Sequence, residues 1–301
     1  MNEKIIREKI NNCITDTDLP CKKHKGKVRD TYDLEKFLLI AVTDRLSAFD
    51  RVLAAIPFKG RVLNQLSAWW CEQTKHIIDN HMIALPSANV SLVKKCKVFP
   101  VEFIVRGYIT GSTSTSLWTH YNAGERTYCG HKLPDGLIKN QVLPQPILTP
   151  TTKEAVHDRP LSAAEIIELK LLTQEEWDFI SRKSLELFKF GQEIATKNDL
   201  ILVDTKYEFG RDEAGNIILI DEIHTPDSSR FWLAESYEEL FKQNKEPDNL
   251  DKEILRLWYK KNCDPYKDET LPKAPDELII KLSRSYIKLY EMITGEKFSY
   301  A

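Results

Sequence analysis

The feature that most constrains the fold of this chain is a pair of apolar, β-rich segments joined by a short turn. Residues 200–210 read LILVDTKYEFG, residues 216–223 read NIILIDEI, and RDEAG lies between them. This pattern predicts a β-hairpin. Alternate side chains of a strand share a face, so Asp204, Lys206 and Glu208 point the same way. Charged groups within an apolar strand are costly to bury unless they pair or bind a ligand.

The other segments favour an α+β fold with antiparallel sheets over a doubly wound parallel sheet, because strands and helices do not alternate regularly. Residues 130–160 are rich in Pro, Gly, Thr and Asp and show no period, which predicts a long functional loop. Strand patterns also occur at 22–32, 36–43 and 95–111, and helical patterns at 2–13, 60–78, 114–122, 162–198, 251–261 and 276–294.

Composition sets broad limits on partners and location. The formal net charge of the 301 residues is -2, so no global basic field invites nucleic acid or an anionic membrane. The apolar runs are too short to span a bilayer, and the N-terminus lacks an apolar core of signal-peptide length, so we expect a cytoplasmic protein. Six cysteines without a CxxC pair signal neither zinc nor redox chemistry. We expect a monomer, with a homodimer as the alternative.

A basic stretch near the N-terminus is the first candidate for anion binding. Lys25, Lys27 and Arg29 alternate, so a strand here would place all three on one face, beside Gly26. Such a face suits a polyphosphate. A solvated edge strand and a nucleic-acid or nuclear-localisation patch are the alternatives.

The two acids of the hairpin are a candidate magnesium site. Glu208 and Asp221 come from adjacent strands, with Lys206 nearby, and Mg²⁺ takes one or two carboxylates together with phosphate and water. A surface hairpin with cross-strand ion pairs is the alternative. A shared ion requires both acids on one face: pairing 208 with 219 provides this, pairing 208 with 218 does not, and a bulge could supply the shift.

Two segments could hold a phosphate monoester. Arg106 lies on a strand and Ser112 follows where a helix is expected to open, which combines a guanidinium with free helix N–H groups. Ser229 and Arg230 place a hydroxyl and a guanidinium directly after the paired acids, which suits a phosphate or a carboxylate. An ordinary helix cap and an Asx or Ser/Thr turn are the respective alternatives.

Two further polar clusters carry weak signals on residue types alone. Asp and Ser are common turn formers, and an isolated His-Asp pair in a loop is usually not catalytic. The clusters are Asp44, Ser47 and Asp50 at a strand end, and Lys153, His157 and Asp158 in the long loop.

Five motifs taken together closely resemble the SAICAR synthetase family. They are GKVRDTY at 26–32, TDRLSAFD at 43–50, RGYITGS at 106–112, VDTKYEFG at 203–210 and IDEIHTPDSSR at 220–230. No single motif is decisive, but the last two at this spacing are specific. The motifs cover roughly residues 20–235, and the helical C-terminal part is similar to the longer, yeast-type form of the family.

The resemblance implies an activity, an ATP-dependent ligase of de novo purine biosynthesis that uses Mg²⁺. ATP would phosphorylate the carboxylate of carboxyaminoimidazole ribotide, and the amine of L-aspartate would displace the phosphate. It also implies a β-rich N-terminal lobe over 1–112 and a larger α+β lobe over 113–301, with ATP in a cleft between them. This plan is similar to that of ATP-grasp enzymes and protein kinases.

The resemblance also implies roles for the candidate residues. By motif, the nucleotide would be contacted by Gly26, Lys27, Val28, Arg29 and Lys206, and Mg²⁺ would be held by Glu208 and Asp221, which act with Lys206 in catalysis. The ribotide phosphate would be bound by Arg106, Ser112, Ser229 and Arg230. The imidazole would lie near Asp44, Ser47 and Asp50, and its carboxylate and the incoming aspartate would be surrounded by Lys153, His157 and Asp158. The alternatives are another ATP-dependent kinase or ligase with a different acceptor, and a non-catalytic nucleotide- or RNA-binding module.

Overall fold

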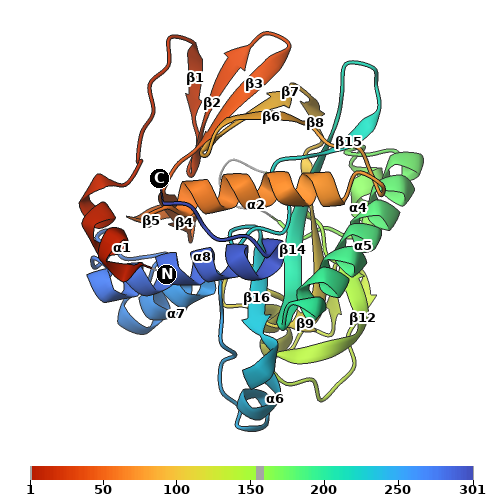
Figure 1. Ribbon diagram of the computed structural model, residues 1–301. Helices are drawn as coiled ribbons and strands as arrows, with labels where there is room; N and C mark the ends of the chain where they lie inside the picture. The colour runs from red at the N-terminus through yellow and green to blue at the C-terminus, as the bar shows by residue number, and fades with distance from the viewer. Residues whose placement is uncertain (1, 154–158, 301) are drawn as a thin grey trace.

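The computed structural model describes residues 2–153 and 159–300 and confirms the α+β class (Figure 1). The N-terminal part forms an antiparallel sheet of five strands. These strands are β1 (Lys22–Lys25), β2 (Arg29–Leu34), β3 (Phe37–Val42), β6 (Met82–Ser87) and β7 (Val90–Lys94). They are ordered β1-β2-β3-β7-β6, and β2 and β3 are joined by the expected turn near Leu34.

A larger sheet of seven strands is built around one long strand, β14. Its members are β8 (Lys97–Val98), β9 (Val101–Ile109), β12 (Gln141–Leu148), β13 (Thr151–Thr152), β14 (Leu200–Arg211), β15 (Ile217–Ile220) and β16 (Ser229–Leu233). β14 pairs with β8, β9, β15 and β16, so it touches most of the sheet. Two small ladders complete the strands: β4 (Arg45–Ala48) with β5 (Arg51–Ala55), and β10 (Thr127–Tyr128) with β11 (His131–Lys132).

The predicted hairpin is confirmed as β14 and β15. Asp212 closes its turn, because Oδ1 accepts hydrogen bonds from Ala214 N (3.0 Å) and Asn216 N (2.9 Å). An acidic side chain that binds its own turn backbone is the usual reason for Asp at such a position.

Helices cover the sheets and fill the space between them. They are α1 (Glu3–Lys9), the 3₁₀ turn η1 (Ile10–Asn12), α2 (Lys59–Gln73), α3 (Leu117–Asn122), α4 (Ala163–Glu168), α5 (Gln174–Lys197), α6 (Ala234–Lys242), α7 (Glu253–Asn262) and α8 (Asp276–Thr294). α2 and α8 pack against each other through the middle of the molecule, and α5 packs on β14 and β9 (Figure 1).

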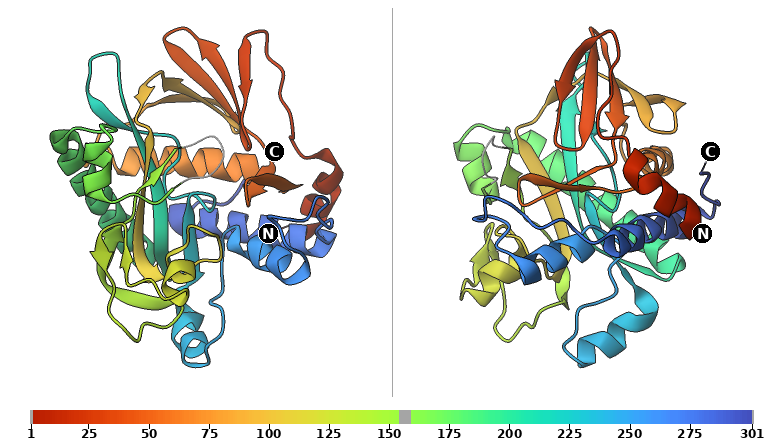
Figure 2. Two further views of the ribbon diagram at one scale, coloured as in Figure 1. Left: turned by 180° about the vertical axis from the view of Figure 1, so that it is seen from behind. Right: turned by 90° about the vertical axis from the view of Figure 1, so that its left-hand side faces the viewer.

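The helix boundaries follow local signals. Thr173 caps α5 with a reciprocal Glu176 contact, as the capping-box pattern predicts. Gly295 ends α8 in the left-handed conformation that its lack of a Cβ permits. The termini lie on the same side of the molecule (Figure 2), where Asn2 N donates a 3.1 Å hydrogen bond to the Tyr300 hydroxyl. Among the described residues, no helix combines the length and the apolar character needed to cross a bilayer.

Two expectations concern the organisation of the chain. The stretch 130–160 is not one long loop, because its Pro-containing segment 141–148 pairs with β9 as the strand β12. The chain changes from the smaller to the larger sheet between β7 and β8, before the lobe boundary expected at residue 112. That boundary stays a prediction, since the main apolar core contains residues of both sheets and a second, smaller cluster lies around Tyr121.

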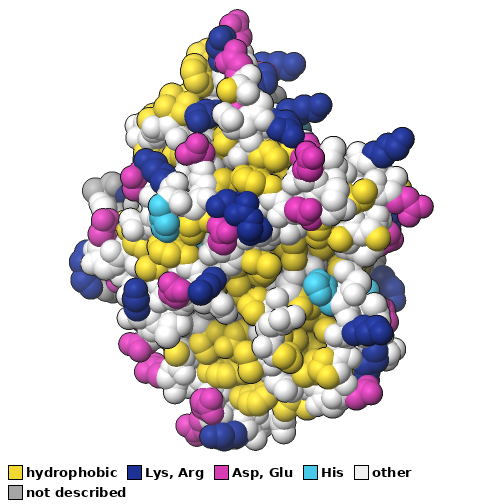
Figure 3. Space-filling model, turned by 90° about the vertical axis from the view of Figure 1, so that its right-hand side faces the viewer, with side chains coloured by type: hydrophobic (Ala, Val, Ile, Leu, Met, Phe, Trp, Pro, Cys, Tyr) yellow, Lys and Arg dark blue, Asp and Glu magenta, His cyan; other side chains and the backbone are white. Residues whose placement is uncertain are grey.

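The surface carries mixed charge on the face shown in Figure 3. Lysine and arginine side chains lie beside aspartate and glutamate, while hydrophobic side chains gather in the lower half of the view. This mixture agrees with a net charge of -2. Any strong local potential must therefore come from clusters such as those described next.

Candidate active site

Two adjoining cavities lie where the sheets meet. The larger is a cleft of about 690 Å³, and the smaller is a pocket of about 200 Å³. We call them the cleft and the side pocket. Their linings overlap, so the two cavities are contiguous. The shared residues are Glu102, Thr113, Thr115, Lys206, Asp227, Ser228, Lys252 and Arg256.

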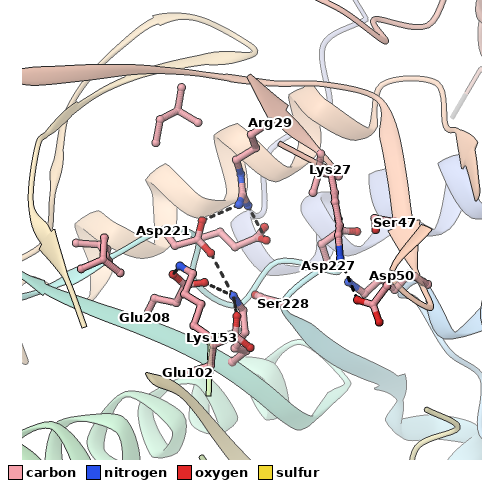
Figure 4. A pocket seen from close by; sticks show the side chains of 18 of the residues that line it. Lys27, Arg29, Ser47, Asp50, Glu102, Lys153, Glu208, Asp221, Asp227 and Ser228 are labelled. Carbon is pink, nitrogen blue, oxygen red and sulfur yellow. Dashed lines mark hydrogen bonds and ion pairs between the residues drawn. The ribbon is translucent and has the colours of Figure 1, made fainter. Parts of the chain in front are cut away.

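The centre of the cleft is a cluster of three carboxylates, Glu102, Glu208 and Asp221 (Figure 4), which all contact the ammonium of Lys206. Lys206 Nζ lies 3.0 Å from Glu102 Oε1 and 3.4 Å from Asp221 Oδ2, and it also contacts Glu208. Burial would lower the pKa of Lys206, but these carboxylates outweigh it and raise the pKa well above its usual value. Lys206 is therefore a permanent cation at neutral pH. Lys153 makes a second ion pair with Glu208.

A guanidinium from the N-terminal sheet completes the cluster. Arg29 Nη1 lies 2.6 Å from Asp221 Oδ1, and its Nη2 lies 2.5 Å from Glu222 Oε1. Burial would raise the pKa of Asp221, but Arg29 and Lys206 outweigh it and lower the pKa below its usual value. Asp221 is therefore ionised, as a metal-binding carboxylate must be.

The register of the hairpin differs from the one that a shared ion was expected to require. β14 and β15 pair Glu208 with Ile220, not with residue 219, so strict alternation would place Asp221 on the opposite face. The strand ends at Ile220, and Asp221 adopts a left-handed φ of 63°. That turn returns its carboxylate to the side of Glu208, where both acids contact Lys206.

The basic stretch is not one continuous strand, so the expected shared face of its three cations is wrong. β1 ends at Lys25, and Gly26 N donates a 2.8 Å hydrogen bond to Arg29 O, which closes a tight turn. Lys25 pairs with Asp16 outside the cleft. The turn itself supplies the cleft lining, namely Lys27, Val28 and Arg29.

The side pocket holds two buried arginines around one carboxylate. Arg106 Nη1 lies 3.5 Å from Asp204 Oδ2, which Arg230 also contacts. Arg106 Nε donates a 2.8 Å hydrogen bond to Thr149 Oγ1. Ser229, the neighbour of Arg230, lines the pocket as well. Two guanidiniums that face 200 Å³ of space suit a phosphate monoester.

Ser112 does not open a helix. α3 begins at Leu117, and Gly111 adopts a φ of 106° within the preceding loop. Ser112 offers its carbonyl to Lys260 Nζ and lines neither cavity, whereas its neighbours Thr113 and Thr115 line both. The expected helix N-terminus is replaced by this loop, in which Gly111 takes a backbone conformation that glycine adopts without strain.

The segment 43–50 divides between structural and cleft residues. Asp44 is buried, and its carboxylate accepts hydrogen bonds from Gly60 N (2.9 Å) and Ile14 N (2.8 Å), away from both cavities. Burial raises the pKa of Asp44, which these backbone bonds partly oppose. Ser47 and Asp50 line the cleft.

Of the three candidates in the segment 153–158, only Lys153 is among the residues that the structure describes. Lys153 lines the cleft and contacts Glu208. His157 and Asp158 lie outside the described residues.

Sequence reasoning missed two cations that line both cavities. Lys252 and Arg256 lie four positions apart, at the start of α7. Burial lowers the pKa of Lys252 to about 8, although Asp227 opposes that shift. An i, i+4 spacing was the available signal, but Lys260 and Lys261 on the same helix made it unspecific. Asp227 and Ser228 lie within the motif at 220–230, but sequence reasoning assigned neither of them a role of its own.

The acids of the cleft suit a hydrated magnesium ion. Among the residues that the structure describes, no group of three or more His, Cys, Asp or Glu could hold a metal ion by itself. Glu208 and Asp221 do meet at one ammonium, which marks a position for positive charge between them. Two carboxylates fit Mg²⁺, whose other ligands are normally phosphate oxygens and water.

Comparisons with known proteins show the family to which the chain is related. A model of the SAICAR synthetase family matches residues 22–273. The phosphoribosylaminoimidazole-succinocarboxamide synthase of Legionella pneumophila (strain Lens) is 62% identical over 289 residues, which cover 96% of this chain and 93% of that protein. The chloroplastic synthase of Arabidopsis thaliana is 59% identical over 298 residues, covering 97% of this chain and 72% of that protein.

Solved structures give the same result. The SAICAR synthase of Saccharomyces cerevisiae, complexed with SAICAR, superposes with a TM-score of 0.81 at 35% identity, covering 95% of this chain and all 100% of that one. A type-2 SAICAR synthetase in complex with ADP superposes with a TM-score of 0.71 at 26% identity, covering 93% of this chain and 100% of that one. The chain belongs to the SAICAR synthetase family.

Proposed function

We propose that this chain is an ATP-dependent ligase that condenses carboxyaminoimidazole ribotide with L-aspartate to give SAICAR, ADP and phosphate in de novo purine biosynthesis. The observation that carries the proposal is the junction of the two cavities. The cluster around Lys206 adjoins a pocket with two buried arginines, and Lys206 itself lines both. A carboxylate and a phosphate on one substrate could therefore lie in the two cavities at once.

We assign ATP to the cleft. The turn that carries Lys27, Val28 and Arg29 faces the transferring phosphates, and apolar side chains such as Leu38 and Ile40 offer a wall for the base. The related type-2 structure in complex with ADP supports this use. Glu208 and Asp221 would hold Mg²⁺, which when bound neutralises negative charge on the phosphates.

In the proposed reaction, the γ-phosphoryl group moves from ATP to a carboxylate oxygen of the ribotide, giving ADP and an acyl phosphate. The aspartate amine then attacks the acyl carbon, phosphate leaves, and the nitrogen loses a proton. Arg29, Lys153 and Lys206 provide positive charge beside the transferring group. Because its pKa is raised, Lys206 acts as a fixed cation and not as a base.

The side pocket would bind the ribotide phosphate through Arg106, Ser229 and Arg230. Arginine suits this task because its planar donor fork matches phosphate oxygens. The yeast structure complexed with SAICAR supports a ribotide ligand at this fold.

Product analysis with and without aspartate tests the proposal. Purified chain supplied with ATP, Mg²⁺ and the ribotide should form SAICAR, identified by mass, only when aspartate is present. Phosphate release that ignores aspartate would favour a kinase or ligase with another acceptor. Binding of RNA without nucleotide turnover would favour a binding module.

We further propose a cytoplasmic monomer, with a homodimer as the alternative. The mixed surface charge in Figure 3 supports a soluble setting. Light scattering coupled to size-exclusion chromatography would give the mass of the protein in solution. A monomer should have a mass of 34.9 kDa.

A further inference from the structure

The last long helix reaches the wall of the candidate site. α8 lies beyond residues 22–273, the range that the family model matches. Yet Tyr286 on this helix is completely buried, and its hydroxyl donates a 2.8 Å hydrogen bond to Asp227 Oδ1. Asp227 lines both the cleft and the side pocket. Tyr286 on the C-terminal helix therefore contacts a residue that lines the candidate site, without lining the site itself.

A second helix holds the other oxygen of the same carboxylate. Lys59, the first residue of α2, is also completely buried, and its Nζ lies 2.9 Å from Asp227 Oδ2. Burial would raise the pKa of Asp227, but Lys59 and Lys252 outweigh it and lower the pKa to about 2. Asp227 is thus a carboxylate whose two oxygens are each fixed by a partner from a different helix.

Hydrogen bonds from its own residues and from β14 hold the backbone of the loop around Asp227. Thr225 Oγ1 accepts hydrogen bonds from the backbone N–H groups of Asp227 and Ser228, each 3.2 Å long. Ser228 O accepts a 2.9 Å hydrogen bond from Lys206 N on β14. The loop therefore joins the anchored carboxylate to the strand that carries the central ammonium, and Asp227 and Ser228, which are labelled in Figure 4, line both cavities.

We infer that Tyr286 and Lys59 are positioning residues that hold Asp227 and Ser228 where the ribotide crosses between the two cavities. The inference rests on the proposed function. Neither positioning residue lines either cavity, so neither touches the substrate directly. The nucleotide contacts at the turn of Lys27 and Arg29 are linked to this loop only indirectly, through the Thr225–Glu222 hydrogen bond and the Glu222–Arg29 ion pair. Ribotide binding should therefore depend on Tyr286 more than ATP binding does.

The test removes one hydroxyl and compares it with a matched control. Tyr286→Phe deletes the hydrogen bond to Asp227 and leaves the ring in place. Tyr290→Phe makes the same change one turn further along α8, where the hydroxyl bonds Glu296 at 3.0 Å, away from both cavities. A hydrogen bond to a charged group is worth about 1.5–3 kcal/mol, which corresponds to a factor of about ten or more.

We expect Tyr286→Phe to raise the KM for the ribotide about tenfold, with the KM for ATP changed less than twofold. Tyr290→Phe should leave both KM values unchanged, even if its melting temperature falls as much as that of Tyr286→Phe. Wild-type kinetic constants in Tyr286→Phe would overturn the inference, as would equal increases in both KM values. A lower kcat with both KM values unchanged would also overturn it, because that pattern means only a smaller folded fraction.

A double-mutant cycle with Asp227→Ala, which removes the acceptor of the Tyr286 hydroxyl, tests the route of the effect. If Tyr286 acts through Asp227, adding Tyr286→Phe to Asp227→Ala should change the ribotide KM less than twofold. A further tenfold increase would show an independent role and contradict the inference.

The two proposals fail in different ways. A wild-type chain that makes no SAICAR fails the proposed function. A wild-type chain that is active, with a Tyr286→Phe variant that has the same constants, fails the positioning inference alone.

Discussion

Arg29 and Asp221 are 192 positions apart in the sequence, yet a 2.6 Å ion pair joins them across the cleft. Arg29 begins β2 of the smaller sheet, and Asp221 follows β15 of the larger one. The side chains of both are 19% exposed, so a ligand in the cleft can reach each charge. A triphosphate would compete for the guanidinium, and a cation would compete for the carboxylate. The pair thus links the two sheets where the proposed chemistry takes place.

Glu208→Gln should abolish turnover while the fold is kept. The change preserves volume but removes a negative charge that two lysines contact and that Mg²⁺ would need. We expect kcat to fall by a factor of about 100 or more. Steady-state kinetics gives the rate, and circular dichroism confirms folding. Glu213→Gln, at an exposed position of the hairpin turn, is the control and should be fully active.

Arg230→Lys should weaken ribotide binding far more than ATP binding. Lysine keeps the charge but loses the fork that holds Asp204 and Glu253 and faces the side pocket. We expect the KM for the ribotide to rise about tenfold or more, because bidentate contact is lost. Arg182→Lys, which changes an exposed pair with Glu186, is the matched control. Similar losses for both substrates would refute the assignment of the side pocket.

Protonation of His224 should contribute to acid destabilisation. Burial lowers the pKa of this imidazole from 6.5 to about 3. The unfolded chain therefore binds a proton below pH 6.5 that the folded chain does not, so the stability is present above pH 6.5 and is lost as the pH falls toward 3. Between pH 7.5 and 5 the loss from this group is about 2 kcal/mol.

Urea unfolding of His224→Asn measures this contribution. The variant has no titrating imidazole here, so its free energy of unfolding should fall less than that of the wild type over the same pH interval. The variant is also less stable at pH 7.5, because the Tyr207 hydroxyl loses its contact with His224. Parallel pH profiles of the two proteins would contradict the assignment.

Gly191→Ala should destabilise the chain although alanine is the better helix former. In an exposed helix interior the change gains about 1 kcal/mol. Here the new Cβ would lie 2.4 Å from His224 Cε1 and 2.7 Å from Leu202 Cδ2. We expect a net loss of about 1–3 kcal/mol from overpacking. Thermal unfolding measures it, and Thr196→Ala on the exposed side of α5 should not lower the melting temperature.

Local signals predicted much of the fold. The hairpin, the cap at Thr173 and the stop at Gly295 depend on residues close together in sequence, and each was found. Cleft residues such as Glu208 and Arg29 could be proposed because they lie within motifs of the resemblance. These are features that a short stretch of chain determines largely by itself.

Long-range packing decided the rest. β12 forms because β9 offers a partner edge, although residues 141–148 contain two prolines and have no strand period. Lys252 joins the site because α7 lies against the loop at Asp227, and no local pattern separates it from the other lysines of that segment. The tight turn at Gly26 likewise depends on the hydrogen bond from Gly26 N to Arg29 O, which the alternation of charged residues in the sequence does not predict.

The left-handed backbone at Asp221 makes the two acids of the cleft non-interchangeable. Short Asp and Asn side chains tolerate positive φ better than longer ones, whereas other residue types lose about 1–2 kcal/mol there. Glu208 occupies a regular strand position that imposes no such limit. Homologous chains with the same backbone conformation at position 221 should therefore carry aspartate there, or a residue that tolerates positive φ equally well. Replacement of Asp221 by glutamate would not be conservative.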